Sequence, residues 1–167
     1  PIVSLRTEVL PETLVIPRYS ALPIRNELVG DIQNMGATLV NTRHGHSWIA
    51  DFDWYEDLRL FTPRSWTERE FPTCGYEGPF VLKGKTNSRK SAWSCRMFAK
   101  DRAAAIHVAS ELAQDPEILK QGIVYREFVP LKTFETDFTG LPITNEHRFF
   151  FWRTTLLEHG YYWSNAS

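Results

Sequence analysis

Residues 78–91 read Gly78-Pro79-Phe80-Val81-Leu82-Lys83-Gly84-Lys85-Thr86-Asn87-Ser88-Arg89-Lys90-Ser91, and this stretch decides how the rest of the chain is interpreted. It begins with strand-forming residues after a Gly-Pro pair and ends in a polar, basic loop. Backbone amides of such a loop, together with ammonium groups, can bind two or three phosphates. The stretch therefore indicates a polyphosphate-binding loop, and the alternative is a solvated hairpin turn.

The composition describes an ordinary globular chain with a weak overall charge. The 167 residues suffice for one compact domain or two small ones, and 43% of them are hydrophobic. A net charge of −1 argues against nucleic-acid or membrane partners. Cys74 and Cys95, with no secretory signal and no long apolar run, predict a cytoplasmic protein with reduced thiols. A disulfide across the strand and loop is the less favoured alternative.

The first part of the chain predicts a βαβ unit. Residues 13–17 are typical of a buried strand, residues 23–35 of a helix with Leu28 and Ile32 on one face, and residues 38–41 of a second strand. A strand, a helix and a strand in this order favour a parallel pair. We further expect a helix over 46–57 and a strand over 58–61. The charged and then Pro/Gly-rich residues 67–78 indicate a boundary, which gives units of 1–72 and 73–167.

The second part predicts an antiparallel sheet with helices, so that the whole chain is α+β. Residues 92–99 are expected to return as a strand beside 80–83, and Asp101 to cap a helix over 102–114. Asp115-Pro116 ends that helix, and a short helical turn follows to Lys120. Further strands are expected at 123–129, 131–138 and 145–155, with a turn at His159-Gly160.

The order of these features resembles the ATP-grasp family, specifically its branch named for one arginine and two lysines. The features, in chain order, are the strand that contains Lys83 with the basic loop after it, the helix over 102–114, the strand end at residues 126–131 and the segment 146–150. The N-terminal residues are similar to the preATP-grasp unit that precedes the domain in such proteins. That likeness is carried by Arg18-Tyr19, Asn41-Thr42, Asp53-Trp54-Tyr55 and Thr62-Pro63. The resemblance implies a preATP-grasp-like unit, an ATP-grasp small subdomain and the start of the large subdomain.

The resemblance also implies roles for individual residues. The nucleotide phosphates would meet Lys83, a second lysine (Lys85 or Lys90), the loop residues Asn87 and Ser88, and Arg148 on the γ-phosphate side. Glu127 would take the adenine amino group with the backbone of Phe128 and Val129, and Glu146 would hold the ribose. At the ends of the parallel strands, Arg18 and Arg43 are candidates for holding a carboxylate substrate.

The implied reaction is ATP-dependent ligation of a carboxylate to an amine or a thiol through an acylphosphate, with ATP and Mg²⁺. One departure from the family concerns the metal. Family members bind magnesium with acids on late strands, whereas only Ser164-Asn165-Ala166-Ser167 follow Trp163. We therefore predict no metal ligands in this chain. Truncation, completion of the site by a partner chain or oligomer, and binding without turnover are the three explanations. An incomplete large subdomain would also leave a sheet edge and an apolar surface exposed.

Other interpretations stay open. Glu127 could pair with Arg126 or Lys132, and Glu146 with Arg148, as ordinary strand ion pairs. A second class of function is an ATP-binding or protein-interaction module without turnover. A third is an ATP-using nucleic-acid protein, against which stands the lack of a Lys-Asp-Gly motif. A metal site is less favoured; its candidate ligands are His44, His46, Asp51 and Asp53. Stacking of nucleobases is also less favoured; its candidates are the aromatic residues within 149–152 and 161–163.

Overall fold

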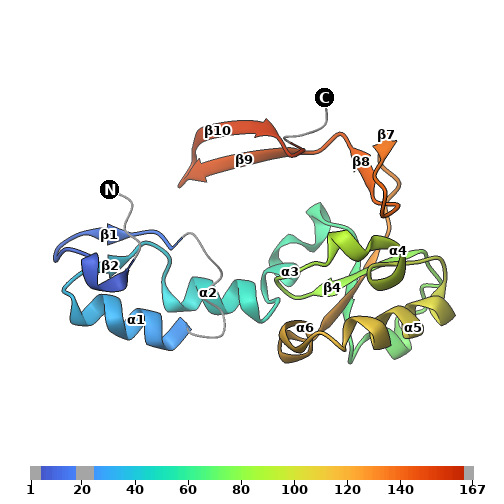
Figure 1. Cartoon of the computed structure of the whole chain (residues 1–167), viewed down its shortest axis with the longest axis horizontal. Helices are drawn as coiled ribbons and strands as arrows, with labels where there is room; N and C mark the ends of the chain where they lie inside the picture. The colour runs from blue at the N-terminus through green and yellow to red at the C-terminus, as the bar shows by residue number, and fades with distance from the viewer. Residues whose placement is uncertain (1–4, 18–24, 164–167) are drawn as a thin grey trace. The chain divides into compact units, whose positions relative to one another are not determined.

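The computed structural model describes residues 5–17 and 25–163. The chain divides into two compact units, Pro1–Arg59 and Leu60–Ser167 (Figure 1). The division therefore lies before the predicted boundary at 72–73. The reason is a short strand, Ser65–Thr67, that pairs within the main sheet of the second unit.

The first unit is built on a parallel strand pair, as predicted. Strand β1 (Leu14–Val15) pairs with β2 (Thr38–Leu39), and helix α1 (Arg25–Asn34) connects them. Leu28, Ile32 and Ala37 form its buried core. Before β1, a 3₁₀ helix, η1 (Arg6–Glu8), is tied to α1 by ion pairs from Arg6 to Glu27 and Asp31. The predicted strands are shorter than expected, but their order and direction are confirmed.

Two predictions at the end of this unit are wrong. The expected helix over 46–57 is split into α2 (Arg43–Ala50) and α3 (Trp54–Leu58). Phe52 lies between them with a φ of 73°, is only 5% exposed and stacks on Tyr55. Burial of this ring thus turns the chain. The expected strand over 58–61 is instead the end of α3 and a 3₁₀ helix, η3 (Arg59–Phe61).

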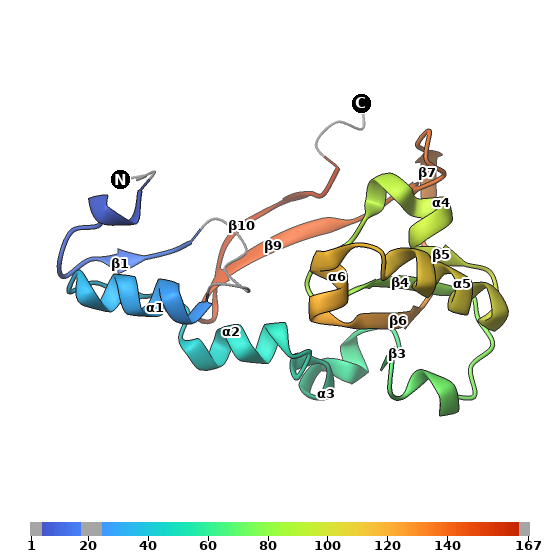
Figure 2. The same cartoon turned by 60° about the horizontal axis from the view of Figure 1, so that its bottom comes forward.

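The second unit contains an antiparallel four-stranded sheet of order β3–β6–β4–β5. The strands are β3 (Ser65–Thr67), β4 (Phe80–Gly84), β5 (Phe98–Ala99) and β6 (Ile123–Glu127). Helices α5 (Arg102–Leu112) and α6 (Pro116–Gln121) cover one face of it (Figures 1 and 2). The core between sheet and helices consists of Phe71, Phe80, Leu82, Ala99, Ala105, Val108, Ala109, Leu112, Ile118, Ile123 and Tyr125.

Capping groups set the starts of both helices, at Asp101 as the sequence predicts and also at Asp115, which the sequence interpretation assigned only to the end of the preceding helix. The Asp101 carboxylate accepts the Ala104 amide at the start of α5, and the Asp115 carboxylate accepts the amides of Glu117 and Ile118 at the start of α6. These side chains satisfy amides that the first turn of each helix leaves without a backbone partner.

The segment before α5 differs from the prediction. The expected strand over 92–99 is largely wrong, because residues 90–92 form the 3₁₀ helix η5, Trp93–Arg96 form α4, and only Phe98–Ala99 pair with β4. Another 3₁₀ helix, η4 (Phe71–Thr73), precedes β4. Both cysteines are free thiols, so the disulfide alternative is wrong.

The C-terminal part forms two separate antiparallel hairpins. One pairs β7 (Thr133–Thr136) with β8 (Pro142–Thr144), and the other pairs β9 (His147–Trp152) with β10 (Thr155–Tyr161). The second hairpin turns at Arg153, which has a φ of 54°, and β10 runs through His159-Gly160, so the predicted turn there is wrong. The apolar side chains of this hairpin are largely exposed; they are Phe149, Phe150, Phe151, Trp152, Leu156 and Leu157. None of the helices in the described ranges is long and apolar enough to cross a membrane.

Candidate functional site

Strand pairing sorts the predicted site residues onto the two faces of the four-stranded sheet. In the β4–β6 register, Val81 pairs with Arg126 and Lys83 with Val124, whereas Phe80 pairs with Glu127. Paired residues of antiparallel strands share a face, and alternate residues along a strand do so as well. Lys83 and Arg126 therefore project from the face opposite α5 and α6. The Glu127 side chain belongs to the other face.

The Lys83 ammonium lies in a half-buried, positively charged setting. Burial is the main cause that lowers the pKa of Lys83 to about 8, and the nearby charges of Arg126 and Lys90 act in the same direction. Arg126 also donates a hydrogen bond to the hydroxyl of Thr62. Three cations from different parts of the chain thus gather at one place, which favours an anionic ligand.

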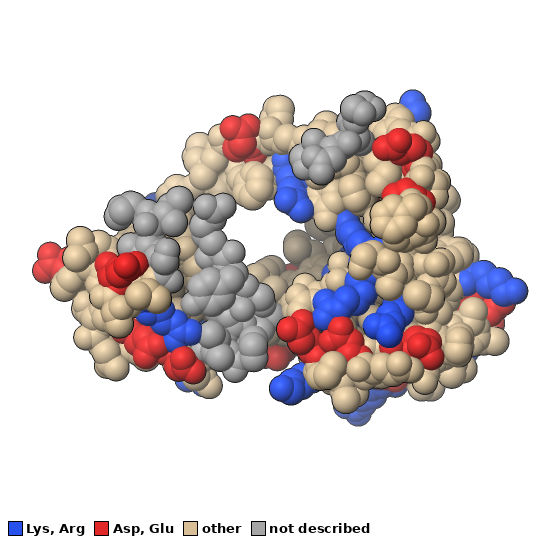
Figure 3. Space-filling model, in the orientation of Figure 1, with Lys and Arg blue, Asp and Glu red and all other residues tan. Residues whose placement is uncertain are grey.

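Tyr162 connects this group of cations to Arg148. The Lys90 Nζ donates to the Tyr162 hydroxyl at 2.6 Å and lies 4.1 Å from the centroid of the Tyr162 ring. The Arg148 guanidinium also lies 4.1 Å from that centroid. Among the ion pairs of residues 5–17 and 25–163, none involves Lys83, Lys90 or Arg148. We call Lys83, Lys90, Arg126 and Arg148 the cationic cluster; Figure 3 shows several Lys and Arg side chains near one another on the visible surface of this unit.

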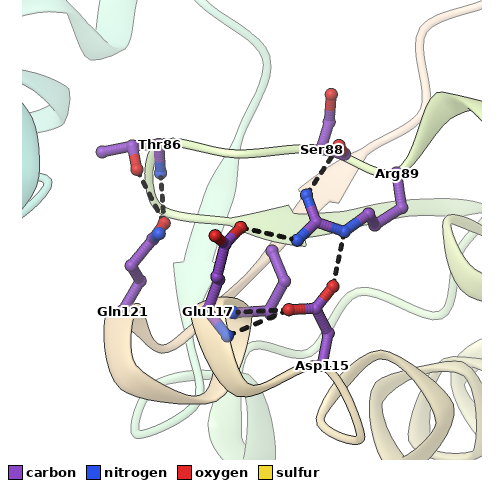
Figure 4. Close-up of polar contacts among 7 residues, drawn as sticks. Thr86, Ser88, Arg89, Asp115, Glu117 and Gln121 are labelled. Atoms are coloured by element: carbon purple, nitrogen blue, oxygen red, sulfur yellow. Dashed lines mark hydrogen bonds and ion pairs between the residues drawn. The ribbon is translucent and has the colours of Figure 1, made fainter. Parts of the chain in front are cut away.

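The loop between Lys83 and Lys90 is fixed to the start and end of α6. Arg89 Nε donates to Asp115 at 2.5 Å, and Arg89 Nη2 donates to Glu117 at 3.0 Å (Figure 4). The Gln121 side-chain oxygen accepts the Thr86 hydroxyl at 2.6 Å and the Thr86 amide at 3.3 Å. Arg89 therefore anchors the loop, and its charge is balanced by the two acids.

Gly84 permits this close approach of α6 to the strand. A Cβ at Gly84 would lie 2.7 Å from Ile118 Cδ1 and 3.2 Å from Gln121 Oε1. A side chain at this position would displace the Ile118 methyl group and the Gln121 amide oxygen, which accepts both hydrogen bonds from Thr86.

The remaining loop candidates lie outside the contacts of the cationic cluster. The Lys85 amide donates to the Gly122 carbonyl at 3.2 Å, and the Lys85 side chain passes beside Gly122. Asn87 is half-buried, Ser88 is exposed, and the Ser88 carbonyl accepts a long bond from Arg89 Nη1 at 3.5 Å. Of the two candidates for the second lysine, Lys90 is the one that the structure brings to Lys83.

Glu127 has a specific partner on its own face of the sheet. Arg64 binds its carboxylate through two hydrogen bonds, of 2.8 Å and 3.1 Å, and this hydrogen bonding is the main cause that lowers the pKa of Glu127. The expected alternative partners, Arg126 and Lys132, are thus not the ones observed. The Phe128 amide donates to the Pro79 carbonyl at 2.9 Å, and Val129 is exposed. The structure does not bring the Glu127 carboxylate to Lys83.

Glu146 lies next to the cationic cluster through the backbone. Its carbonyl accepts the Tyr162 amide at 2.9 Å, and its carboxylate accepts the Thr144 hydroxyl. The expected Glu146–Arg148 ion pair is not among those of the described residues, and Arg148 contacts Tyr162 instead.

An aromatic cluster of Trp93, Phe98 and Phe128 lies on the same face as Lys83. Phe98 pairs with Val81 across β5 and β4, and its ring centroid is 5.3 Å from that of Phe128 and 5.9 Å from that of Trp93. Half-buried aromatic rings beside a group of cations suit a ligand that combines an aromatic base with phosphates.

Of the two candidate substrate residues in the first unit, Arg18 lies outside the described residues. Arg43 is exposed at the first position of α2, where Thr42 caps the helix by accepting the Gly45 amide at 3.1 Å. In the described parts of the chain, no group of at least three His, Cys, Asp or Glu side chains could hold a metal ion.

The sequence interpretation missed Arg126, Trp93 and Phe98 as site residues. It considered Phe128 only for its backbone, and Tyr162 only among residues 161–163 that could stack on bases. In the sequence, Arg126 stands out only as a partner of Glu127. The signal that identifies it is the strand period: of two neighbouring residues on a strand, only one can share the face of Lys83. Tyr162 carries no comparable signal, because its contact with Lys90 joins residues 72 positions apart.

Comparison with known proteins gives the family. The model of the ATP-grasp domain, family 3 of the clade named for one arginine and two lysines, matches residues 70–167, and the chain belongs to this family. The resemblance to ATP-grasp proteins of this branch is thereby confirmed. Neither the search of curated proteins nor the search of solved structures found a significant match. Membership indicates ATP binding and ATP-dependent, ligase-like chemistry at the level of the family.

Proposed function

We propose that the cationic cluster binds the polyphosphate of ATP and that the chain takes part in ATP-dependent ligation of a carboxylate to an amine or a thiol. The observation that carries the proposal is the convergence of Lys83, Lys90, Arg126 and Arg148 on one face of the sheet. Cations gathered at one place repel one another, and a polyanion relieves that repulsion. Lys83 benefits most, because a phosphate beside it favours its charged form.

The proposed orientation of the nucleotide follows from the neighbours of the cluster. The base and ribose lie toward Trp93, Phe98 and Phe128, and the backbone near Val129 is the part of the strand end that is exposed for pairing with the base. The phosphates extend toward Lys90 and Arg148. In the acylphosphate route, bound ATP supplies the phosphoryl group, and these cations stabilise the charge on its oxygens.

The roles of the first unit belong to the same proposal. A preATP-grasp-like unit would use Arg43, with Arg18, to hold the carboxylate substrate. The parallel β1–β2 pair supports this assignment, because ligands of such units bind at the carboxyl ends of the strands.

Binding of ATP by the full chain tests the phosphate site. Isothermal calorimetry should give an ATP dissociation constant at least about tenfold higher for Lys83→Ala and for Arg126→Ala than for the natural sequence. Lys100→Ala removes an exposed cation of the same unit and should leave the affinity unchanged. Equal affinity of all four proteins would overturn the phosphate site.

Turnover is a separate measurement. Release of ADP or phosphate that requires both an added carboxylate and an added amine or thiol supports ligation. ATP binding without such release, over a panel of acids and nucleophiles, would favour a nucleotide-binding module.

A further inference from the structure

Tyr162 is attached to two members of the cationic cluster at once. Its hydroxyl accepts a hydrogen bond from Lys90 Nζ at 2.6 Å, and its ring contacts both Lys90 and Arg148. The hydrogen bond from Lys90 is the main cause that lowers the pKa of Tyr162, and the charge of Arg148 acts in the same direction. The Tyr162 hydroxyl thus acts as an acceptor for Lys90, and the Tyr162 ring lies beside both cations.

We propose that Tyr162 is an internal ligand of the phosphate site: its hydroxyl holds a position beside Lys90 that a phosphate oxygen of the nucleotide takes, so that nucleotide binding displaces it. This inference rests on the proposed function. It adds a competing contact, built into the chain, that sets how strongly the site binds ATP.

The position of Tyr162 in the chain makes such displacement feasible. Tyr162 follows the last residue of strand β10, and rotation of its side chain breaks the hydrogen bond from Lys90 while it leaves the backbone pairing of the hairpin intact. Its backbone stays fixed by the bond from its amide to the Glu146 carbonyl. The motion required is therefore a change of side-chain rotamer at a half-buried position.

The surroundings of Trp163 indicate that the packing of Tyr162 and Trp163 against Lys90 carries an energetic cost. The Trp163 ring lies 4.5 Å from Lys90 Nζ, and its indole Nε1 is buried without a hydrogen-bond partner in the described part of the chain. A buried donor without a partner destabilises the arrangement that holds it. Release of Tyr162 and Trp163 from Lys90 would expose this donor to water.

A phosphate is the better ligand for these cations. It offers several acceptor oxygens and full negative charge, and hydrogen bonds between two charged groups are stronger than one from an ammonium to a phenol. The nucleotide and the Tyr162 hydroxyl would therefore compete for Lys90. The nucleotide would displace the hydroxyl, and the loss of the Lys90–Tyr162 hydrogen bond would weaken ATP binding by the free energy of that bond.

Calorimetric titration of the full chain with ATP tests the inference. Tyr162→Phe keeps the ring beside Lys90 and Arg148 and removes only the hydroxyl, so ATP should bind about tenfold more tightly than to the natural sequence. Tyr161→Phe is the matched control. The Tyr161 hydroxyl donates to the Thr144 carbonyl at 3.0 Å, away from the cluster, and its loss should leave ATP affinity unchanged.

A spectroscopic measurement on the natural sequence makes the test independent of the variant's folding. When ATP draws Lys90 and Arg148 to its phosphates, the pKa of Tyr162 should rise toward its ordinary value of 10.0. Phenolate absorbance just below pH 10 should then fall on ATP addition, and Tyr162→Phe should lack this change.

The outcomes separate the two proposals. Equal or weaker ATP binding by Tyr162→Phe, in a chain that binds ATP, overturns the internal ligand and leaves the phosphate site standing. Failure of the natural sequence, Tyr162→Phe and Tyr161→Phe to bind ATP at all overturns both.

Discussion

The two faces of the four-stranded sheet differ in chemistry although the same strands build them. On one face, Phe80 and Leu82 of β4 and Tyr125 of β6 pack against α5 and α6 and are at most 7% exposed. On the other, Lys83 of β4 and Arg126 of β6 join the cationic cluster. Alternation along a strand thus lets neighbouring residues serve stability and ligand binding separately. Substitutions on the two faces should therefore have different consequences.

The largest effect on stability is expected on the helix-covered face. Phe80 is fully buried and contacts the rings of Trp66, Phe71 and Tyr76, so Phe80→Ala should lower the free energy of unfolding by about 3–5 kcal/mol. Val81→Ala, one residue later on the opposite face, should cost about 1 kcal/mol, because Val81 is only half-buried. Urea unfolding measures both. Similar losses of unfolding free energy in the two variants would show that both faces contribute equally to stability, contrary to the difference expected between them.

A smaller effect of opposite sign is expected at Lys83. Its pKa is about 8 in the folded chain against 10.5 for an ordinary lysine, so the unfolded chain binds more protons between these values and stability rises with pH across that window. Lys83→Met removes this penalty. It should stabilise the chain by on the order of 1 kcal/mol below pH 8, with the difference vanishing toward pH 10.5, while it weakens ATP binding.

Urea unfolding of both proteins at several pH values from 7 to about 10.5 checks this pH dependence. A constant difference between the two stability curves would mean that the Lys83 ammonium is well hydrated in the folded chain. The same result would remove the physical reason for expecting it to attract a phosphate.

Local signals predicted β4, β6, α5 and α6 of the second unit. Asp101 indicated the start of α5, Asp115-Pro116 indicated the break before α6, and the apolar run before Glu127 indicated β6. These features depend on residues a few positions apart. The features that were missed depend on distant partners or on a single turn: β3 exists through its pairing with β6, and the hairpin turns at Arg153 because β9 and β10 pair there.

The sequence predicted which types of residue form the site better than it predicted how they are arranged. The basic loop identifies Lys83 and Lys90, and the structure does bring them together. Arg126 and Glu127 are adjacent in the sequence, and only the register with β4 determines which one shares the face of Lys83. That register is a long-range property, and a shift by one residue would exchange the two side chains.

The smallest effect is expected at Glu127, where the sequence interpretation and the geometry differ most. The sequence assigns its carboxylate to the adenine amino group, whereas the structure pairs it with Arg64 on the helix-covered side of the sheet. We therefore expect Glu127→Gln to cost well under about 1 kcal/mol of stability, because Arg64 is 60% exposed and the ion pair is screened.

The preference for ATP over GTP, measured as a ratio of dissociation constants, should change less than about twofold in Glu127→Gln, since one lost base contact would change it by about tenfold or more. Arg64→Ala is the informative control, because it removes the partner and leaves the carboxylate. A relaxed base preference in Glu127→Gln, together with a normal one in Arg64→Ala, would restore the adenine role. It would also show that nucleotide binding draws the Glu127 side chain away from Arg64, so that the two faces of the sheet are less separate than their register implies.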